Sequence, residues 1–385
     1  MAAPLDGLKV VELARILAGP WAGQTLADLG ADVIKVESPE GDDTRRWGPP
    51  FISREGGECS AAYFHGCNRG KRSVVADFRT PEGQALVRDL ARDADVLIEN
   101  FRPGGLVKYR LDHASLRALN PRLICCSITG FGQDGPYAGR AGYDFIIQGM
   151  SGLMSITGAP DGPPMKTGVA ITDLFTGVYA TTAILAALHQ RRATGRGQHI
   201  DMALFDVAVS VTANQAMNCL ATGAAPGRLG NAHPNLAPYQ VFECADGPVI
   251  VAVGNDSQFR RFCEAVGQGG LALCPEYRTN ADRVEHRDRL TAALSAATRR
   301  RGRAELLAAC EAADVPAGPI NDLVGVFGDP QVVARGMRID PGGVPGVRSP
   351  MRFSGAEMSL DSPAPRLDEH GQRIRGAAQS RETSG

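Results

Sequence analysis

Short apolar runs alternate with helical patterns between residues 8 and 128, and this alternation constrains the fold more than any other feature. The apolar runs have the length and continuous apolar character of buried parallel strands. They are Leu8–Leu13, Asp32–Glu37, Arg72–Asp77, Asp95–Glu99 and Leu123–Ile128. The helical patterns between them are Trp21–Leu29, Pro81–Arg92 and Ala114–Leu119. Strands that alternate with helices form parallel sheets through right-handed crossovers. The chain is therefore predicted to contain an α/β domain with an open, mostly parallel, doubly wound, Rossmann-like sheet.

A change in composition indicates a second domain in this chain of 385 residues, which is long enough for more than one core. Residues 223–238 are rich in Gly, Pro, Ala and Asn and are predicted to be a linker. The large domain then covers residues 1–222, and residues 330–385 form a linker and a C-terminal segment, with a strand expected at Met351–Ser354. A smaller α+β domain is expected at 239–329. Its strand and helix patterns are Gly247–Gly254, Gln258–Val266, Arg283–Thr298 and Arg303–Ala313.

Charge and composition exclude several classes of protein. The formal net charge is −1, which gives no reason to expect nucleic acid or an anionic membrane surface as a partner. The nine cysteines lack paired spacing, which is typical of reduced thiols in a cytoplasmic protein. The N-terminus lacks a basic region followed by an apolar one, so no secretory signal is expected. The longest uncharged apolar run, Leu174–Leu188, is too short and too rich in Thr to span a bilayer.

Common cofactor motifs are missing from the sequence. The first strand-to-helix turn, Ala14–Pro20, has no Gly-x-Gly-x-x-Gly, so no nicotinamide cofactor is expected, although Glu37 stands where a ribose-binding acid would stand. Walker A, His-Glu-x-x-His and Gly-x-Ser-x-Gly sequences are also absent. The seven histidines show no metal-ligand spacing, and no metal is predicted.

Basic residues occur in the loops that connect the predicted strands and helices and at the start of one strand. Sheets of this type bind ligands at the carboxyl ends of their strands, so these loops should form one rim. The basic residues are Arg45, Arg46, Lys71, Arg72, Arg102 and Lys108. A cationic rim on a nearly neutral protein favours an anionic small molecule, such as a phosphorylated one. The alternative is that these are solvated loop charges, which is the commoner fate of any single arginine.

The stretch Thr167–Leu188 places one acid, Asp173, where a long and almost uncharged helix is expected to begin. Acids are common at helix starts, so Asp173 could simply be the N-cap. The positive end of the helix dipole would also keep a carboxylate ionised there, ready to act as a nucleophile. The local pattern alone leaves both interpretations open.

A series of short motifs accompanies the Asp173 stretch in a fixed order. The motifs are Gly19-Pro20, Leu29–Glu37, Gly41–Arg45, Asn68–Ser73, Glu99–Gly104, Ser127–Gly132, Gly142–Asp144 and Gly195–Gln198. Their order and spacing resemble those of the class III CoA-transferases, the CaiB/BaiF-type family that includes formyl-CoA:oxalate and carnitine CoA-transferases. The resemblance covers the chain from Leu8 to about Arg352. The resemblance implies a homodimer of interlocked chains in which the C-terminal segment returns to the large domain.

The same resemblance implies a covalent mechanism on Asp173. The carboxylate would attack an acyl-CoA, giving a mixed anhydride and then an aspartyl-CoA thioester, and the acceptor acid would reverse these steps. Tyr143 would lie near the acyl group, and Leu17 stands where the oxalate enzyme has a glutamine. The loop that includes Asn255 and Asp256 takes the place of a glycine-rich loop that covers the nucleophile. Contacts to coenzyme A are expected from Arg45, Asn68, Lys71, Asn100, Phe101 and Lys108.

The acyl groups and two other functions stay open on the sequence. Leu17 and the Asn255–Asp256 loop favour a C4–C6 dicarboxylate acceptor, with succinyl-CoA as an example of the donor, and Arg15, Arg140 or His233 could bind the distal carboxylate. A 2-methylacyl-CoA racemase is one alternative, but that branch has a His-Asp pair where this chain has Tyr143-Asp144, and tyrosine is a poor base at neutral pH. A non-catalytic acyl-CoA-binding protein is the other alternative.

Overall fold

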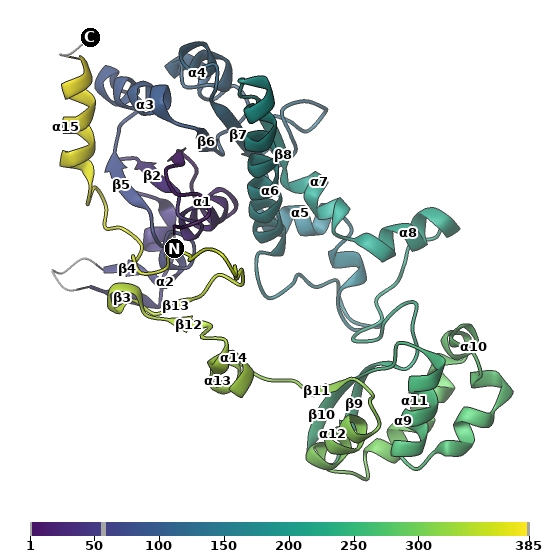
Figure 1. Ribbon diagram of the computed structural model, residues 1–385. Coiled ribbons are helices and arrows are strands. Elements are labelled where there is room, and N and C mark those ends of the chain that lie inside the picture. Colours follow the sequence, from purple (N-terminus) through teal and green to yellow (C-terminus); the bar gives the residue numbers. More distant parts are fainter. Residues whose placement is uncertain (1, 55–58, 383–385) are drawn as a thin grey trace. The chain divides into compact units, whose positions relative to one another are not determined.

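The computed structural model describes residues 2–54 and 59–382, and these divide into two compact units (Figure 1). The sheet unit comprises Met1–Leu153, Lys166–Ala213 and Pro330–Gly385. The second unit comprises Met154–Met165 and Asn214–Asp329. The chain therefore enters the second unit twice before the C-terminal segment joins the sheet unit.

The sheet unit is built on a six-stranded parallel sheet in the order β5-β2-β1-β6-β7-β8. Its strands are β1 (Lys9–Glu12), β2 (Asp32–Glu37), β5 (Arg72–Val75), β6 (Val96–Glu99), β7 (Ile124–Thr129) and β8 (His199–Ala203). In chain order this is 3-2-1-4-5-6, the doubly wound order in which β1 and β6 are neighbours. The prediction of a parallel α/β sheet is confirmed.

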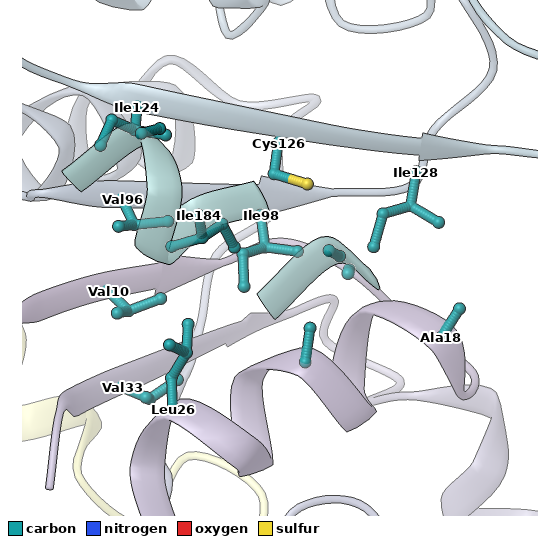
Figure 2. Close-up of a cluster of buried hydrophobic side chains, with 14 of the residues drawn as sticks. Val10, Ala18, Leu26, Val33, Val96, Ile98, Ile124, Cys126, Ile128 and Ile184 are labelled. Carbon is teal, nitrogen blue, oxygen red and sulfur yellow. The ribbon is translucent and has the colours of Figure 1, made fainter. Parts of the chain in front are cut away.

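Helices cover both faces of this sheet because successive strand residues point to opposite sides. Val10, Ile98 and Cys126 face a core shared with α1 and α6, which Figure 2 shows. Their neighbours Val11 and Leu97 face the second core, which is shared with α3 and α15. The covering helices are α1 (Ala18–Asp28), α6 (Ile171–Thr194) and α7 (Leu204–Ser210) on the first face, and α3 (Pro81–Asp93), α4 (His113–Leu119) and α15 (Gly371–Glu382) on the second.

Helix α6 approaches α1 closely at Gly177, where an added Cβ would lie 2.8 Å from the Ala18 carbonyl oxygen. By length and composition α6 is apolar enough to cross a membrane, and its inward side packs on α1 and the sheet. Gly177 lies one turn after Asp173, so the same close contact sets the position of that acid.

The rest of the sheet unit consists of short elements, and the sequence predicted few of them. Residues 351–354 form no strand, so the strand expected at Met351–Ser354 is wrong. Helix α15, which packs on α3 and β5, had no prediction. The short elements are β3 (Phe51–Ser53), β4 (Cys59–Ala61), α2 (Ala62–His65), α5 (Asp144–Met150), α14 (Pro330–Ala334), β12 (Arg338–Ile339) and β13 (Gly346–Val347).

The second unit packs helices against a three-stranded antiparallel sheet in the order β11-β10-β9. Phe242, Phe259, Phe262 and Leu294 lie at the centre of its core. The expected strand and helices are present, although one predicted helix is divided at His286. The elements are α8 (Ala213–Thr222), β9 (Tyr239–Cys244), β10 (Gly247–Ala252), α9 (Asp256–Ala265), α10 (Asn280–Glu285), α11 (Arg287–Thr298), α12 (Arg303–Ala312), β11 (Ala317–Pro319) and α13 (Leu323–Gly328).

Candidate active site

A cavity of about 430 Å³ opens at the carboxyl ends of β1, β6 and β7. Its wall is formed by residues 15–18 after β1, 100–103 and 105 after β6, and 128–130 at the end of β7, together with 140–143, Asp173 and Leu204. Strands β1 and β6 are neighbours, but their connections lead to opposite ends of the sheet. This topological switch point is where open α/β sheets bind ligands.

Asp173 lies on the cavity wall in the first turn of α6 but does not cap the helix. The N-cap residue is Ala170, and its side chain makes no capping bond. Asp144, from the start of α5, accepts the hydrogen bonds at the start of α6 instead. Its Oδ1 accepts hydrogen bonds from the Thr172 amide at 2.8 Å and the Thr172 hydroxyl at 2.5 Å, and a longer one from the Asp173 amide at 3.4 Å. Among the described residues, none donates a hydrogen bond to the carboxylate of Asp173.

The environment of Asp173 differs from the one expected for an ionised helix-start acid. Surrounding protein desolvates the carboxyl, the nearby charge of Asp144 acts in the same direction, and together they raise the pKa of Asp173 to about 7. Burial and the charge of Asp144 thus oppose the helix dipole, which was expected to keep the Asp173 carboxylate ionised. A carboxylate that is costly to ionise is more basic. Its conversion into a neutral ester or thioester removes that energetic cost.

The predicted substrate residues of the sheet unit meet at this cavity. Leu17, Arg15, Arg140 and Tyr143 all line it, as does Arg102. Leu17 precedes α1 and is nearly buried, whereas Tyr143 is well exposed. The Arg15 guanidinium is paired with Asp43 at 3.0 Å, and that pair is largely solvated. The loops that the sequence predicted for the acyl group therefore meet at one cavity, and their contact with an acyl group stays a prediction.

Arg140 is the cavity arginine best placed to bind a carboxylate of a ligand. Its guanidinium carbon lies 4.0 Å from the centre of the Tyr137 ring, so the aromatic face holds the planar group in place. Among the described residues, no carboxylate forms an ion pair with Arg140. The cation is therefore available to a ligand.

The six residues predicted to bind coenzyme A occupy two different environments. Asn100 and Phe101 line the cavity. The Asn100 side chain accepts from the Arg15 amide at 2.9 Å and donates to the Arg15 carbonyl at 2.7 Å, which clamps the β1 and β6 loops together. Lys108 is exposed, with its ammonium 4.7 Å from the centre of the Tyr109 ring.

Arg45, Asn68 and Lys71 are instead buried in the scaffold. The Arg45 guanidinium forms a close pair with Glu37, at 2.7 and 2.8 Å. The Lys71 ammonium contacts Glu12 and the Asn68 side-chain oxygen, both at 2.8 Å. Their polar groups are thus directed at protein partners instead of a phosphate, and their contact with coenzyme A stays a prediction.

Comparison with known proteins decides the family. The model for CoA-transferase family III matches residues 5–371. This chain belongs to that family. The succinate–glutarate CoA-transferase of Agrobacterium fabrum is 58% identical over 96% of this chain and 94% of its own length. The succinyl-CoA:glutarate CoA-transferase of Mus musculus is 41% identical over 96% of this chain and 85% of its own length. A solved CAIB/BAIF family protein from Brucella suis is 62% identical, covers 98% of this chain and all of its own, and has a TM-score of 0.89.

Three predicted residues of this CoA-transferase lie in the second unit. The Asn255 side chain caps α9 by accepting from the Gln258 amide at 2.9 Å. Asp256 is paired with the buried Arg283 at 2.8 Å. The ring of His233 lies 5.1 Å from that of Tyr239, and its Nδ1 accepts from the Asn235 amide. These contacts explain the local structure of the Asn255–Asp256 loop, whereas its role at the acyl group stays a prediction.

Two residues near Asp173 of this CoA-transferase were missed from the sequence. Asp144 was named only as part of a motif, because nothing local shows that it will reach the first turn of α6. Tyr63 from α2 packs edge-on against Trp47 at 5.3 Å. Burial and then the charge of Asp173 raise the pKa of the Tyr63 phenol, so the two side chains interact electrostatically. No sequence signal connects residue 63 with residue 173.

Proposed function

We propose that this CoA-transferase moves CoA from succinyl-CoA to a small dicarboxylate through an aspartyl-CoA thioester on Asp173. The observation that carries the proposal is the carboxyl of Asp173, which lies on the cavity wall with a pKa of about 7 and no donor among its described neighbours. A carboxylate with this environment is a better nucleophile than a solvated one. Relatives named as succinate–glutarate and succinyl-CoA:glutarate transferases support the choice of substrates.

The chemistry balances without any other reactant. The Asp173 carboxylate attacks the thioester carbonyl, and the C–S bond breaks to give a mixed anhydride and the CoA thiolate. The thiolate attacks the Asp173 carbonyl, which releases succinate and leaves the aspartyl-CoA thioester. The acceptor carboxylate attacks this thioester, and the thiolate then takes the new acyl group from the second anhydride. The two anhydrides and the thioester are all prone to hydrolysis, so the cavity must exclude water during the cycle.

Arginine and leucine on the cavity wall support a dicarboxylate with a distal anionic end. One carboxylate of the substrate must reach Asp173, which leaves the second to be bound elsewhere. Arg140 offers an oriented guanidinium on the same wall, with Arg15 near it in the lining. A guanidinium binds a carboxylate through two parallel hydrogen bonds. Leu17 supplies an apolar surface for the methylene groups between the two ends.

We further propose that the working form is a homodimer with interlocked chains. Apolar side chains are exposed on α5 and along the outer side of α6, including Phe145, Ile146, Val178 and Tyr179. Helices α5 and α6 contact each other, and exposed apolar side chains on neighbouring helices support an interaction site. Light scattering of the purified chain tests this point, and a monomeric mass at micromolar concentration would contradict it.

A donor and acceptor matrix tests the function. Succinyl-CoA, acetyl-CoA and formyl-CoA are each incubated with glutarate, oxalate and butyrate, and the new thioester is separated by chromatography. The proposal predicts fast transfer from succinyl-CoA to glutarate and slow transfer to butyrate, which lacks the distal carboxylate. A 2-methylacyl-CoA in D₂O forms the last arm, and deuterium uptake without any CoA exchange would favour the racemase alternative.

A further inference from the structure

We propose that Asp144 is a positioning residue for CoA transfer, which fixes the first turn of α6 and keeps a negative charge beside Asp173. The inference rests on the proposed function, because it assigns a role in the chemistry of that nucleophile. Asp144 would act on the substrate only through Asp173.

The contacts of Asp144 show why the start of α6 depends on it. An α-helix leaves its first amide groups without partners, and a side chain from the N-cap usually satisfies one of them. Ala170 cannot do so, and Asp144 reaches across from α5 to accept from the amide and hydroxyl of Thr172. Asp173 is the next residue, so its backbone is held by the same carboxylate.

A second set of bonds holds the carboxylate of Asp144 in place. Its Oδ2 accepts from the Gln148 amide nitrogen at 2.6 Å. Gln148 is fully buried, and its oxygen accepts from the amide of Thr167 at 3.0 Å and from the Thr167 hydroxyl at 3.3 Å. These hydrogen bonds link Thr167 through Gln148 and Asp144 to Thr172. They therefore hold both ends of the segment that leads into α6.

The bonding pattern also decides which of the two acids carries the negative charge. Gln148 and Thr172 both donate to the Asp144 oxygens, which is the arrangement of a carboxylate anion. Asp173 has no such donors, and two neighbouring carboxyls do not ionise equally. Conversion of Asp173 into an anhydride or thioester removes its charge from beside Asp144. The fixed charge of Asp144 therefore favours formation of the covalent adduct.

Other charged or titratable groups around the pair do not change sign in the same pH range. Tyr63 faces it from α2, Tyr143 precedes α5, and the arginines of the cavity wall are Arg15, Arg102 and Arg140. Tyrosine and arginine side chains ordinarily titrate well above neutral pH. The acid limb of the pH–rate profile should therefore report the carboxyl of Asp173.

The test compares wild type with Asp144→Asn and with the double variant Asp144→Asn/Gln148→Glu. In the double variant the new amide at position 144 donates to the new carboxylate at position 148, which still accepts from Thr167. The hydrogen bonds and the net charge are kept, but the negative charge moves one hydrogen bond away from Asp173. Transfer from succinyl-CoA to glutarate is measured from about pH 5 to about pH 9, with folding checked by circular dichroism.

We expect the acid limb of kcat to move down by about one pH unit in both variants, because a like charge has left the nucleophile. We expect kcat at neutral pH to fall by about tenfold to a hundredfold, with KM for succinyl-CoA nearly unchanged. Thr172→Val keeps both carboxyls, so its acid limb should stay in place while its melting temperature falls. A folded double variant with the wild-type acid limb and kcat would overturn the role of Asp144. Absence of CoA transfer in wild type would instead overturn the proposed function.

Discussion

Asp173→Asn should make the protein more stable than wild type, and increasingly so as the pH rises. Burial and Asp144 raise the pKa of Asp173 from 3.8 to about 7. Because the folded pKa lies above the unfolded one, the folded state keeps the proton longer. Stability is therefore lost as the pH rises from about 4 to about 7, and the loss is complete above that range. Asparagine carries no charge, so the variant escapes this loss.

The size of the effect follows from the two pKa values. Between about pH 5 and about pH 8.5, a single carboxyl with these pKa values lowers the free energy of unfolding of wild type by about 2 to 3 kcal/mol. The variant lacks this carboxyl and keeps that stability. Partial access of solvent to the cavity puts the lower figure closer to expectation.

Urea unfolding of both proteins at the two pH values measures this difference, with Asp206→Asn as the control. Asp206 is an exposed acid in the first turn of α7, so this control corrects for the loss of one negative charge near a helix start. A constant difference between wild type and Asp173→Asn at both pH values would refute the account of the Asp173 environment.

Three further changes test the packing and the pocket. Gly177→Ala should destabilise the chain by about 1 to 3 kcal/mol and slow transfer, because the new Cβ meets the Ala18 backbone; an unchanged melting temperature would contradict this. Arg283→Lys should lower the free energy of unfolding in urea by about 3 kcal/mol, because the buried guanidinium donates to the Ala237 and Tyr277 carbonyls and to Asp256. The control is Arg289→Lys in the exposed pair with Glu276, which should lower it by less than about 1 kcal/mol. Arg140→Gln should reduce the preference for glutarate over butyrate by about tenfold or more, and an unchanged preference would remove Arg140 from the pocket.

The sheet could be predicted from the sequence because its signal is local. Each strand is a short apolar run, and the order of runs and helices dictates parallel pairing. The runs around Val10, Leu97 and Cys126 became neighbouring strands in this way. The strand expected at Met351–Ser354 did not form, and helix α15 had no prediction, because both segments depend on contacts with distant parts of the chain.

Only those site residues could be predicted that lie at strand ends or within the family motifs. The strand ends and motifs located Asp173, Leu17, Arg140 and Asn100 on one cavity. They could not show that Lys71 and Arg45 would be directed inward at Glu12 and Glu37, because a buried ion pair depends on tertiary contacts between distant loops. For the same reason the contact between Asp144 and the first turn of α6 could not be predicted.

The measurement that tests the central claim most directly is the mass of the protein after exposure to succinyl-CoA without an acceptor. The account predicts a covalent adduct of one CoA per chain, mapped by peptide mass spectrometry to Asp173 and lost on treatment with hydroxylamine. The adduct should be absent from Asp173→Asn and should disappear when glutarate is added, as glutaryl-CoA forms. An adduct on any other residue, or turnover by Asp173→Asn at the wild-type rate, would contradict the assignment of the nucleophile.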